Sequence, residues 1–245
     1  IKWCLCLRNM DAPSGATARQ VFDALRFNAS ARNRLVADIH QVLTDNPWLD
    51  EVDIDLEGGG NQHQAESEEI FRRVADAAHA RGKTVAAALP ALTSTGSVGG
   101  ENWVRYHELG QILDYVSIMS YDMAWSGSAP GPVSPGFWVR DVYDWATSQI
   151  PAHKLSMGLP AYARAWVIHD YPTGPYRGTS GTSYAARNWL DGTWAAGPGT
   201  VDMPQMSWLA FRDTDHVPWA YLGVWDWLRV PPDGGPHGGR RRDRD

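Results

Sequence analysis

The chain has 245 residues, a net charge of -6, a hydrophobic content of 43% and a charged content of 20%. That length suits one large α/β domain, since an α/β barrel takes about 250 residues. The acidic balance argues against a nucleic acid as partner. No apolar run approaches the roughly 18 residues that a membrane-spanning helix needs, so a membrane is not an expected partner either.

The two cysteines, Cys4 and Cys6, stand in the run IKWCLCLRN. Side chains two positions apart in a strand lie on the same face, but the extended backbone holds them too far apart to form a disulfide. A Cys-x-Cys pair with no further cysteine is also a poor metal site. We therefore predict that both are small, buried hydrophobic side chains.

Apolar runs and helical patterns alternate along the chain. The expected strands are 1–9, 51–57, 83–91, 113–122, 154–162 and 219–228, and the expected helices are about 30–43, 65–83, 101–113 and 137–149. Ser30 is the expected cap of the first helix. Only the stretch of about fifty residues before the last strand looks rich in loops.

Strand-to-strand steps of about 30 to 40 residues with helices between them imply parallel βα units. Their repetition predicts an α/β fold of the (β/α)8 TIM-barrel type, and no Gly-x-Gly-x-x-Gly turn favours a dinucleotide fold. Six strands leave two βα units missing, so we expect the chain to be part of a larger protein or assembly. We assign 1–230 to a partial barrel and 231–245, rich in Pro, Gly and Arg, to a disordered tail.

The segment LDEVDIDLEGGG combines acids with the alternation of a buried strand. Asp53, Asp55 and Glu57 point to one side, and the apolar residues between them point to the other. Three inward carboxylates repel one another unless some are protonated or hydrogen-bonded. Glu57 precedes three glycines and is expected at the carboxyl rim of the barrel, where crowding by Asp55 would raise its pKa toward that of a general acid.

Two other interpretations of this acidic strand remain open. It could be an edge strand with a solvated acidic face, although the flanking helices imply a covered, parallel sheet. Its Asp-x-Asp pattern could also bind a divalent metal ion, since Mg2+ and Mn2+ prefer oxygen ligands. No His-x-His or His-Glu-x-x-His motif accompanies it, so we expect no metal and no cofactor.

The spacing Asp50-x-x-Asp53-x-Asp55-x-Glu57 resembles the signature of glycoside hydrolase family 18, the chitinase-like family. MSYD at 119–122, LSMGLPAYARAW at 155–166 and LGVWDW at 222–227 resemble the family's sixth, seventh and eighth barrel strands. This resemblance covers about 2–228 and makes 51–57 the fourth strand and 1–9 the third, with the first two before Ile1. Two family features are absent: LRN replaces Ser-x-Gly-Gly, and loop-like residues replace a long α+β insertion.

The resemblance implies substrate-assisted catalysis. Glu57 would protonate the glycosidic oxygen while the substrate's own 2-acetamido carbonyl attacks, giving an oxazolinium ion. Asp55 would hold the acetamido N–H, Asp53 would share a proton or hydrogen bond with it, and Tyr121 would bind the acetamido oxygen. The implied sugar-binding residues are Trp227, which would floor the site, together with Asp122, Met119, Tyr162, Arg164 and Trp125.

Other segments resemble one branch of the family. LRFNASARNRLVADIHQVL, VAAALPA and GPVSPGFW look like the bacterial peptidoglycan and spore-cortex N-acetylglucosaminidase type, which also occurs in phage lytic or tail-associated proteins. The expected substrate is therefore an N-acetylglucosamine-containing polysaccharide with β-1,4 links, peptidoglycan before chitin. An extracellular, cell-wall or virion-associated location is favoured.

Two other functions stay open. A non-catalytic carbohydrate-binding or structural domain on the same scaffold would fit an incomplete barrel within a larger assembly. A metal-dependent Asp-x-Asp enzyme would be inactivated by a chelator, which family 18 chemistry would survive. The presence of Glu at position 57 favours catalysis over the first of these alternatives.

Overall fold

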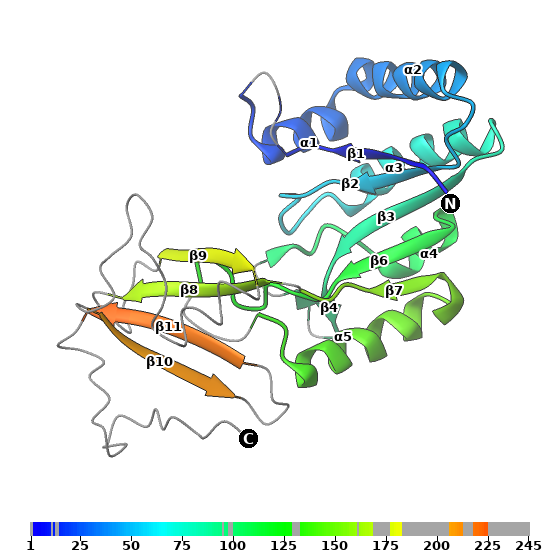
Figure 1. Cartoon of the computed structure of the whole chain (residues 1–245). Helices are drawn as coiled ribbons and strands as arrows, with labels where there is room; N and C mark the ends of the chain where they lie inside the picture. Colours follow the sequence, from blue (N-terminus) through cyan, green and yellow to red (C-terminus); the bar gives the residue numbers. More distant parts are fainter. Residues whose placement is uncertain are drawn as a thin grey trace. The chain divides into compact units, whose positions relative to one another are not determined.

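The structure is a computed structural model of the chain (Figure 1). It describes residues 2–10, 12, 15–94, 96–97, 100–128, 133–160, 162–168, 177–182, 206–212 and 218–224. The chain divides into two compact units, each with its own sheet. The first comprises Ile1–Ser120 with Asp141–Gly158, and the second comprises Tyr121–Arg140 with Leu159–Asp245.

The first unit contains a five-stranded parallel sheet in the order β1-β2-β3-β6-β7. Its strands are β1 (Cys4–Arg8), β2 (Glu51–Asp55), β3 (Thr84–Pro90), β6 (Tyr115–Met119) and β7 (Leu155–Met157). A short antiparallel pair, β4 (Leu92–Thr93) and β5 (Gly96–Ser97), follows β3. All five long-sheet strands fall inside predicted strands, and their parallel pairing confirms the prediction of an α/β fold built from βα units.

Helices connect the parallel strands. They are α1 (Ala18–Phe27), α2 (Ala29–Asp45), α3 (Gln64–His79), α4 (Tyr106–Ile112), α5 (Gly136–Gln149) and the 3-10 helix η2 (Ala152–Lys154). The prediction of a helix capped by Ser30 was wrong, because Asn28 separates α1 from α2. The Asn28 side chain accepts hydrogen bonds from the backbone N–H groups of Ser30 and Ala31, at 2.9 and 3.2 Å, and so caps α2.

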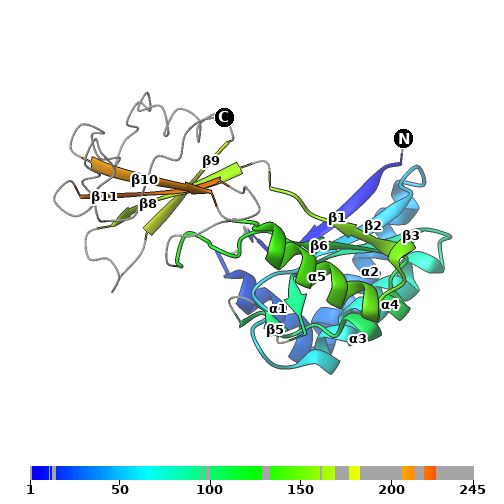
Figure 2. The same cartoon turned by 90° about the horizontal axis from the view of Figure 1, so that it is seen from below.

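One face of the parallel sheet forms the core of the first unit. Its strands place Val52, Ile54, Val85, Ala87, Leu89, Val116 and Ile118 on that face, all buried. Figure 2 shows the helices gathered on one side of this sheet. The apolar side chains of α3, including Ile70, Phe71 and Val74, are buried there as well. The helix-covered face is therefore apolar, as expected for the outer face of a parallel barrel sheet.

The opposite face carries the cysteines and the acids. In the parallel register Cys6 lies beside Asp53, and Arg8 lies beside Asp55. Neighbours in register share a face, so Cys4 and Cys6 point away from the helices. Both thiols are exposed in the part of the chain that the structure describes. The prediction that they are buried was wrong, because the strand alternation that fixed their common side did not say which side it was.

The second unit contains a four-stranded sheet in the order β10-β11-β8-β9. Its strands are β8 (Tyr162–Ile168), β9 (Arg177–Thr182), β10 (Met206–Arg212) and β11 (Pro218–Val224). The pairs β8–β9 and β10–β11 are antiparallel, and β11 runs parallel to β8. β9 and β10 lie in the stretch that we expected to be loop, and β11 contains the start of the run expected as the eighth barrel strand.

Candidate active site

The acids of β2 lie on the face of the sheet that the helices leave open. Asp53 and Asp55 are half-buried, whereas Val52 and Ile54 on the other face are fully buried. β2 ends at Asp55, and Glu57 follows two residues beyond its carboxyl end. This alternation confirms the predicted separation of acids from apolar residues. It also places Glu57 at the end of the sheet where parallel α/β proteins carry their chemistry.

Burial shapes the charge state of both aspartates. It raises the pKa of Asp53, and the nearby carboxylates of Asp55 and Glu51 raise that pKa further. Burial also raises the pKa of Asp55, while the Arg8 guanidinium opposes that rise. The charge of the Asp55 carboxylate therefore favours the protonated form of Asp53.

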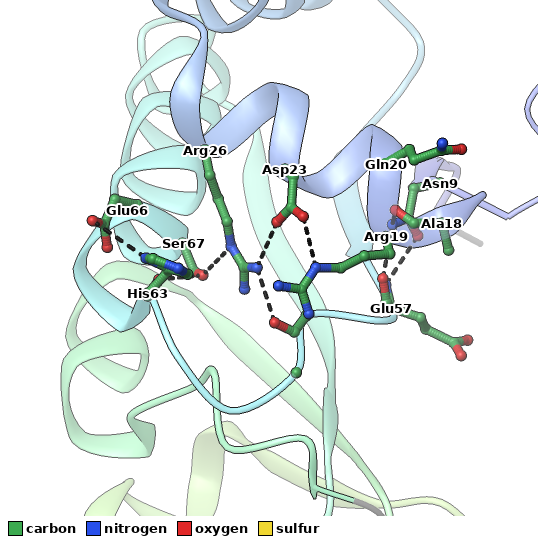
Figure 3. A network of polar contacts seen from close by, with 12 residues as sticks. Asn9, Ala18, Arg19, Gln20, Asp23, Arg26, Glu57, His63, Glu66 and Ser67 are labelled. Carbon is green, nitrogen blue, oxygen red and sulfur yellow. Dashed lines mark hydrogen bonds and ion pairs between the residues drawn. The ribbon is translucent and has the colours of Figure 1, made fainter. Parts of the chain in front are cut away.

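The backbone of Glu57 is held by a buried side chain, Asn9 at the end of β1. The Asn9 Oδ1 accepts a hydrogen bond from the Glu57 N–H at 2.9 Å, and its Nδ2 donates to the Glu57 carbonyl at 2.9 Å. The same Nδ2 donates to the carbonyl of Ala18 at 2.8 Å. Figure 3 shows this contact, with the Glu57 carboxyl group pointing away from α1.

The three glycines after Glu57 let the backbone of this loop pass close to neighbouring side chains. A Cβ on Gly59 would lie 2.2 Å from Cδ1 of the buried Trp103 ring. Gly58 and Gly60 have φ of 75° and 69°, a region that favours glycine. The side chain of Arg26 then donates to the Gly59 carbonyl at 2.9 Å. The glycines thus allow a tight loop whose path is fixed by packing and by a buried guanidinium.

A second group of predicted residues meets in the second unit. The Tyr162 hydroxyl donates to Oδ1 of Asp122 at 2.7 Å. The rings of Tyr121 and Tyr162 meet edge to face, with their centres 6.1 Å apart. Asp122 has φ of 61°, a left-handed conformation that costs a non-glycine residue about 1–3 kcal/mol and occurs often at functional sites. Tyr121, Asp122 and Tyr162 thus form one polar cluster.

For the remaining predicted residues we describe the position in the fold. Met119 is half-buried at the end of β6, beside Pro90 of β3 in the register. Trp125 is 46% exposed in a turn closed by Ser128. The backbone of Arg164 pairs with that of Ser180 between β8 and β9. Trp227 lies outside the described residues.

Asp50, the first acid of the motif, has a structural contact. Its carboxylate accepts a hydrogen bond from the backbone N–H of Trp3 at 2.8 Å, and its own N–H donates to the Trp3 carbonyl at 2.8 Å. Asp50 therefore ties the start of β2 to the start of β1. Among the described residues, no group of three or more His, Cys, Asp or Glu side chains is arranged to hold a metal ion.

Two residues that contact the Glu57 loop were not predicted from the sequence: Asn9 and Arg26. Asn9 belongs to the LRN that departs from the family's Ser-x-Gly-Gly, and that departure was the available signal. Arg26 carried no signal, because an arginine in an amphipathic helix is ordinarily a solvated surface residue. Here its side chain is fully buried.

The five-stranded parallel sheet, with Glu57 just beyond the carboxyl end of β2, is that of an α/β protein. The chain belongs to the glycosyl hydrolases family 18, whose family model matches residues 13–229. In the described part of the chain, none of the helices has the length and apolar character needed to cross a bilayer.

The relatives include a glycosylase and a lytic enzyme of Bacillus subtilis and several chitinases. The chain is 30% identical over 166 residues to the candidate sporulation-specific glycosylase YdhD of Bacillus subtilis, covering 65% of this chain and 37% of that protein. It is 31% identical over 121 residues to the cortical fragment-lytic enzyme of the same species, covering 48% and 28%. The chain thus spans well under half the length of these curated relatives.

Solved structures show the same fold. The YdhD structure matches with a TM-score of 0.68 and 23% identity, covering 87% of this chain and 68% of that one. A chitinase from Chromobacterium violaceum matches with a TM-score of 0.64 and 22% identity, covering 87% and 64%. These matches support the prediction of a TIM-barrel type of fold.

Proposed function

We propose that this chain is the catalytic part of a retaining glycoside hydrolase that cleaves β-1,4-linked N-acetylglucosamine glycans. Glu57 is the general acid, and the substrate's own acetamido group is the nucleophile. Residues 1–230 carry the activity, and 231–245 are a tail. The observation that carries the proposal is the acid arrangement of β2: two half-buried carboxyls with raised pKa values, followed by Glu57 at the open carboxyl end.

Each acid has a separate role in this mechanism. Glu57 gives its proton to the glycosidic oxygen as the bond to the leaving sugar breaks. Asp55 accepts a hydrogen bond from the acetamido N–H and, when ionised, stabilises the positive charge that develops on the ring. Asp53 shares a proton or a hydrogen bond with Asp55, and its own burial and the nearby carboxylates raise its pKa and so favour its protonated form.

The family resemblance assigns sugar binding to the cluster of Tyr121, Asp122 and Tyr162. Tyr121 donates to the acetamido oxygen and orients it for attack, which converts nucleophilic displacement into an intramolecular step. Asp122, fixed by the Tyr162 hydroxyl, contacts sugar hydroxyls. Arg164, Trp125, Met119 and Trp227 complete the sugar site, with Trp227 as the apolar floor.

Peptidoglycan is the first substrate and chitin oligomers are the second. The names of the matched relatives support this order, since one is a cortical fragment-lytic enzyme and the other a candidate sporulation-specific glycosylase. Both glycans contain the 2-acetamido group that the mechanism requires. No metal or cofactor takes part in the proposed mechanism.

The test compares products from purified peptidoglycan and from chitin oligomers, with the anomeric form of the first product followed by NMR. We expect a new reducing-end N-acetylglucosamine formed with retained configuration, at the same rate with and without a chelator. Inverted products would contradict substrate assistance. Loss of activity with chelator would favour a metal-dependent Asp-x-Asp enzyme. Binding without any cleavage would favour a carbohydrate-binding domain.

A further inference from the structure

The Asn9 side chain holds the backbone of Glu57 as a neighbouring strand would. One carboxamide satisfies both main-chain polar groups of a single residue, at 2.9 Å each. Asn9 is only 2% exposed, so water does not compete for these bonds. The peptide unit of Glu57 lies two residues beyond β2, where the strand ladder no longer fixes it. Asn9 supplies the fixation that the ladder lacks at this point.

The same carboxamide ties Glu57 to a rigid support. Its Nδ2 also donates to the carbonyl of Ala18, the first residue of α1. That end of α1 is closed by a capping box between Thr17 and Gln20, which restricts its motion. A Cβ added to Gly58 would lie 3.4 Å from the backbone nitrogen of Arg19 and 3.6 Å from the Cβ of Ala18, so the loop lies close to the start of α1 here as well. Glu57 is therefore positioned against the start of a capped helix.

The far end of α1 holds the same loop two residues later. Arg26 donates to the Gly59 carbonyl at 2.9 Å and to the Ser67 hydroxyl at 3.0 Å, and it pairs with Asp23 at 3.1 Å (Figure 3). A buried guanidinium is costly unless it is paired, and this one pairs with a carboxylate, a hydroxyl and a loop carbonyl. The segment that begins with the acid is thus held to the start of α1 through Asn9 and to the end of α1 through Arg26.

We propose that Asn9 is a positioning residue for the general acid: through the backbone of Glu57 it sets the direction from which the carboxyl group approaches the glycosidic oxygen. The proposal rests on the proposed function, in which Glu57 is that acid. Proton transfer requires the carboxyl oxygen within hydrogen-bonding reach of the leaving oxygen. A displacement of about 1 Å costs about 10²-fold in rate. A freed Glu57 backbone permits such a displacement.

The proposal predicts a selective loss of rate. A sugar leaving group needs a proton from the acid, whereas a dinitrophenolate leaves without one. In the full chain, Asn9→Ala should therefore lower kcat on the unsubstituted N-acetylglucosamine oligomer by about 30- to 100-fold. On the dinitrophenyl glycoside of the same sugar its kcat should stay within about 3-fold of wild type, and KM should change little on either substrate.

The matched control is Asn46→Ala. The Asn46 carboxamide also donates to a backbone carbonyl, that of Val42 at 3.0 Å, but at the end of α2. It should lower the melting temperature without changing either rate. Asn9→Asp retains the acceptor for the Glu57 N–H and loses both donated bonds, so it serves as the second variant if Asn9→Ala melts below the assay temperature. It should show the same selectivity.

Two failures can be told apart. Glu57→Gln should show the selective loss in stronger form, and if it loses neither rate or both rates equally, the proposed function fails. If Glu57→Gln is selective but the Asn9 variants lose neither rate, or lose both equally, the positioning role is overturned and Asn9 is structural only.

Discussion

The hydroxyl of Tyr162 donates a 2.7 Å hydrogen bond to the carboxylate of Asp122, a residue held at φ of 61°. The two residues come from motifs 40 positions apart, and the bond joins the two parts of the predicted sugar-binding set. A left-handed aspartate is sustained by such contacts, because the backbone alone disfavours it. The bond therefore marks Asp122 as a residue with an imposed orientation.

Tyr162→Phe removes this bond and leaves the ring in place. Hydrogen bonds to charged groups contribute about 1.5–3 kcal/mol, so we expect kcat/KM on N-acetylglucosamine oligomers to fall by about 10- to 100-fold. Tyr143→Phe changes an exposed tyrosine of α5 in the same way and should leave the rate unchanged. Equal rates for both variants and the wild type would remove Tyr162 from the site.

Asp53→Asn tests the electrostatics of β2 through stability. Burial, Asp55 and Glu51 raise the pKa of Asp53, so the folded protein binds this proton more tightly than the unfolded chain does. The contribution of this bound proton to the free energy of unfolding is complete below the unfolded-state pKa of about 3.9, and it is lost as pH rises through the raised pKa of the folded state. Asp53→Asn does not titrate at this position, so its free energy of unfolding in urea should become more favourable relative to that of the wild type as pH rises from 4 to 7.

The control for this titration is Asp38→Asn, which changes an exposed aspartate of α2. Its difference from the wild type should not grow with pH in the same direction. A difference between Asp53→Asn and wild type that shrinks or stays constant over this range would show that the Asp53 carboxyl is not destabilised by its surroundings.

Arg8→Ala tests the charge state of Asp55. Burial raises the pKa of Asp55 and the Arg8 guanidinium lowers it, so removing the cation should raise it further. Asp55 would then stay protonated to higher pH, and the acid limb of the pH profile of kcat/KM should move to higher pH. Arg8→Lys keeps the charge and should restore most of the profile. A limb that stays in place or moves to lower pH would contradict the assigned role of Asp55.

The parallel sheet could be predicted from the sequence because its signals are local. Apolar alternation and helical periodicity are read within one element, and the spacing between elements implies parallel connections. The predictions that were wrong depended on contacts between elements. The open side of β1 could not be told from its own alternation, so Cys4 and Cys6 were placed in the core. Asn28 rather than Ser30 caps α2, because α1 ends at that point.

The site residues also divide into those with a local sequence signal and those defined by distant contacts. The acids of β2 were found because their spacing of two is itself the geometry, one face of one strand. Asn9 was missed because its function lies in a contact with Glu57, 48 residues away. Arg26 was missed because its burial depends on Gly59 and Ser67, 33 and 41 residues away. A single sequence contains no local pattern for such contacts.

Gly59→Ala tests the close packing of the acid loop. The new Cβ would lie 2.2 Å from the Trp103 ring, so the loop or the ring must move. Overpacking of this kind costs about 1–3 kcal/mol, which should appear in the free energy of unfolding measured in urea. Gly82→Ala is the comparison: its site is open but has φ of 68°, so it reports backbone strain alone. Wild-type stability for Gly59→Ala would contradict the packing described.

The central claim is that the carboxyl group of Glu57 supplies the proton that breaks the glycosidic bond. The most direct measurement is the hydrolysis rate of Glu57→Gln on peptidoglycan and chitin oligomers, with glycan affinity measured calorimetrically on the same preparation. We predict a rate loss of about 10³-fold or more with Kd nearly unchanged, because Gln keeps the shape and loses the transferable proton. Hydrolysis within about 10-fold of the wild type would contradict the account.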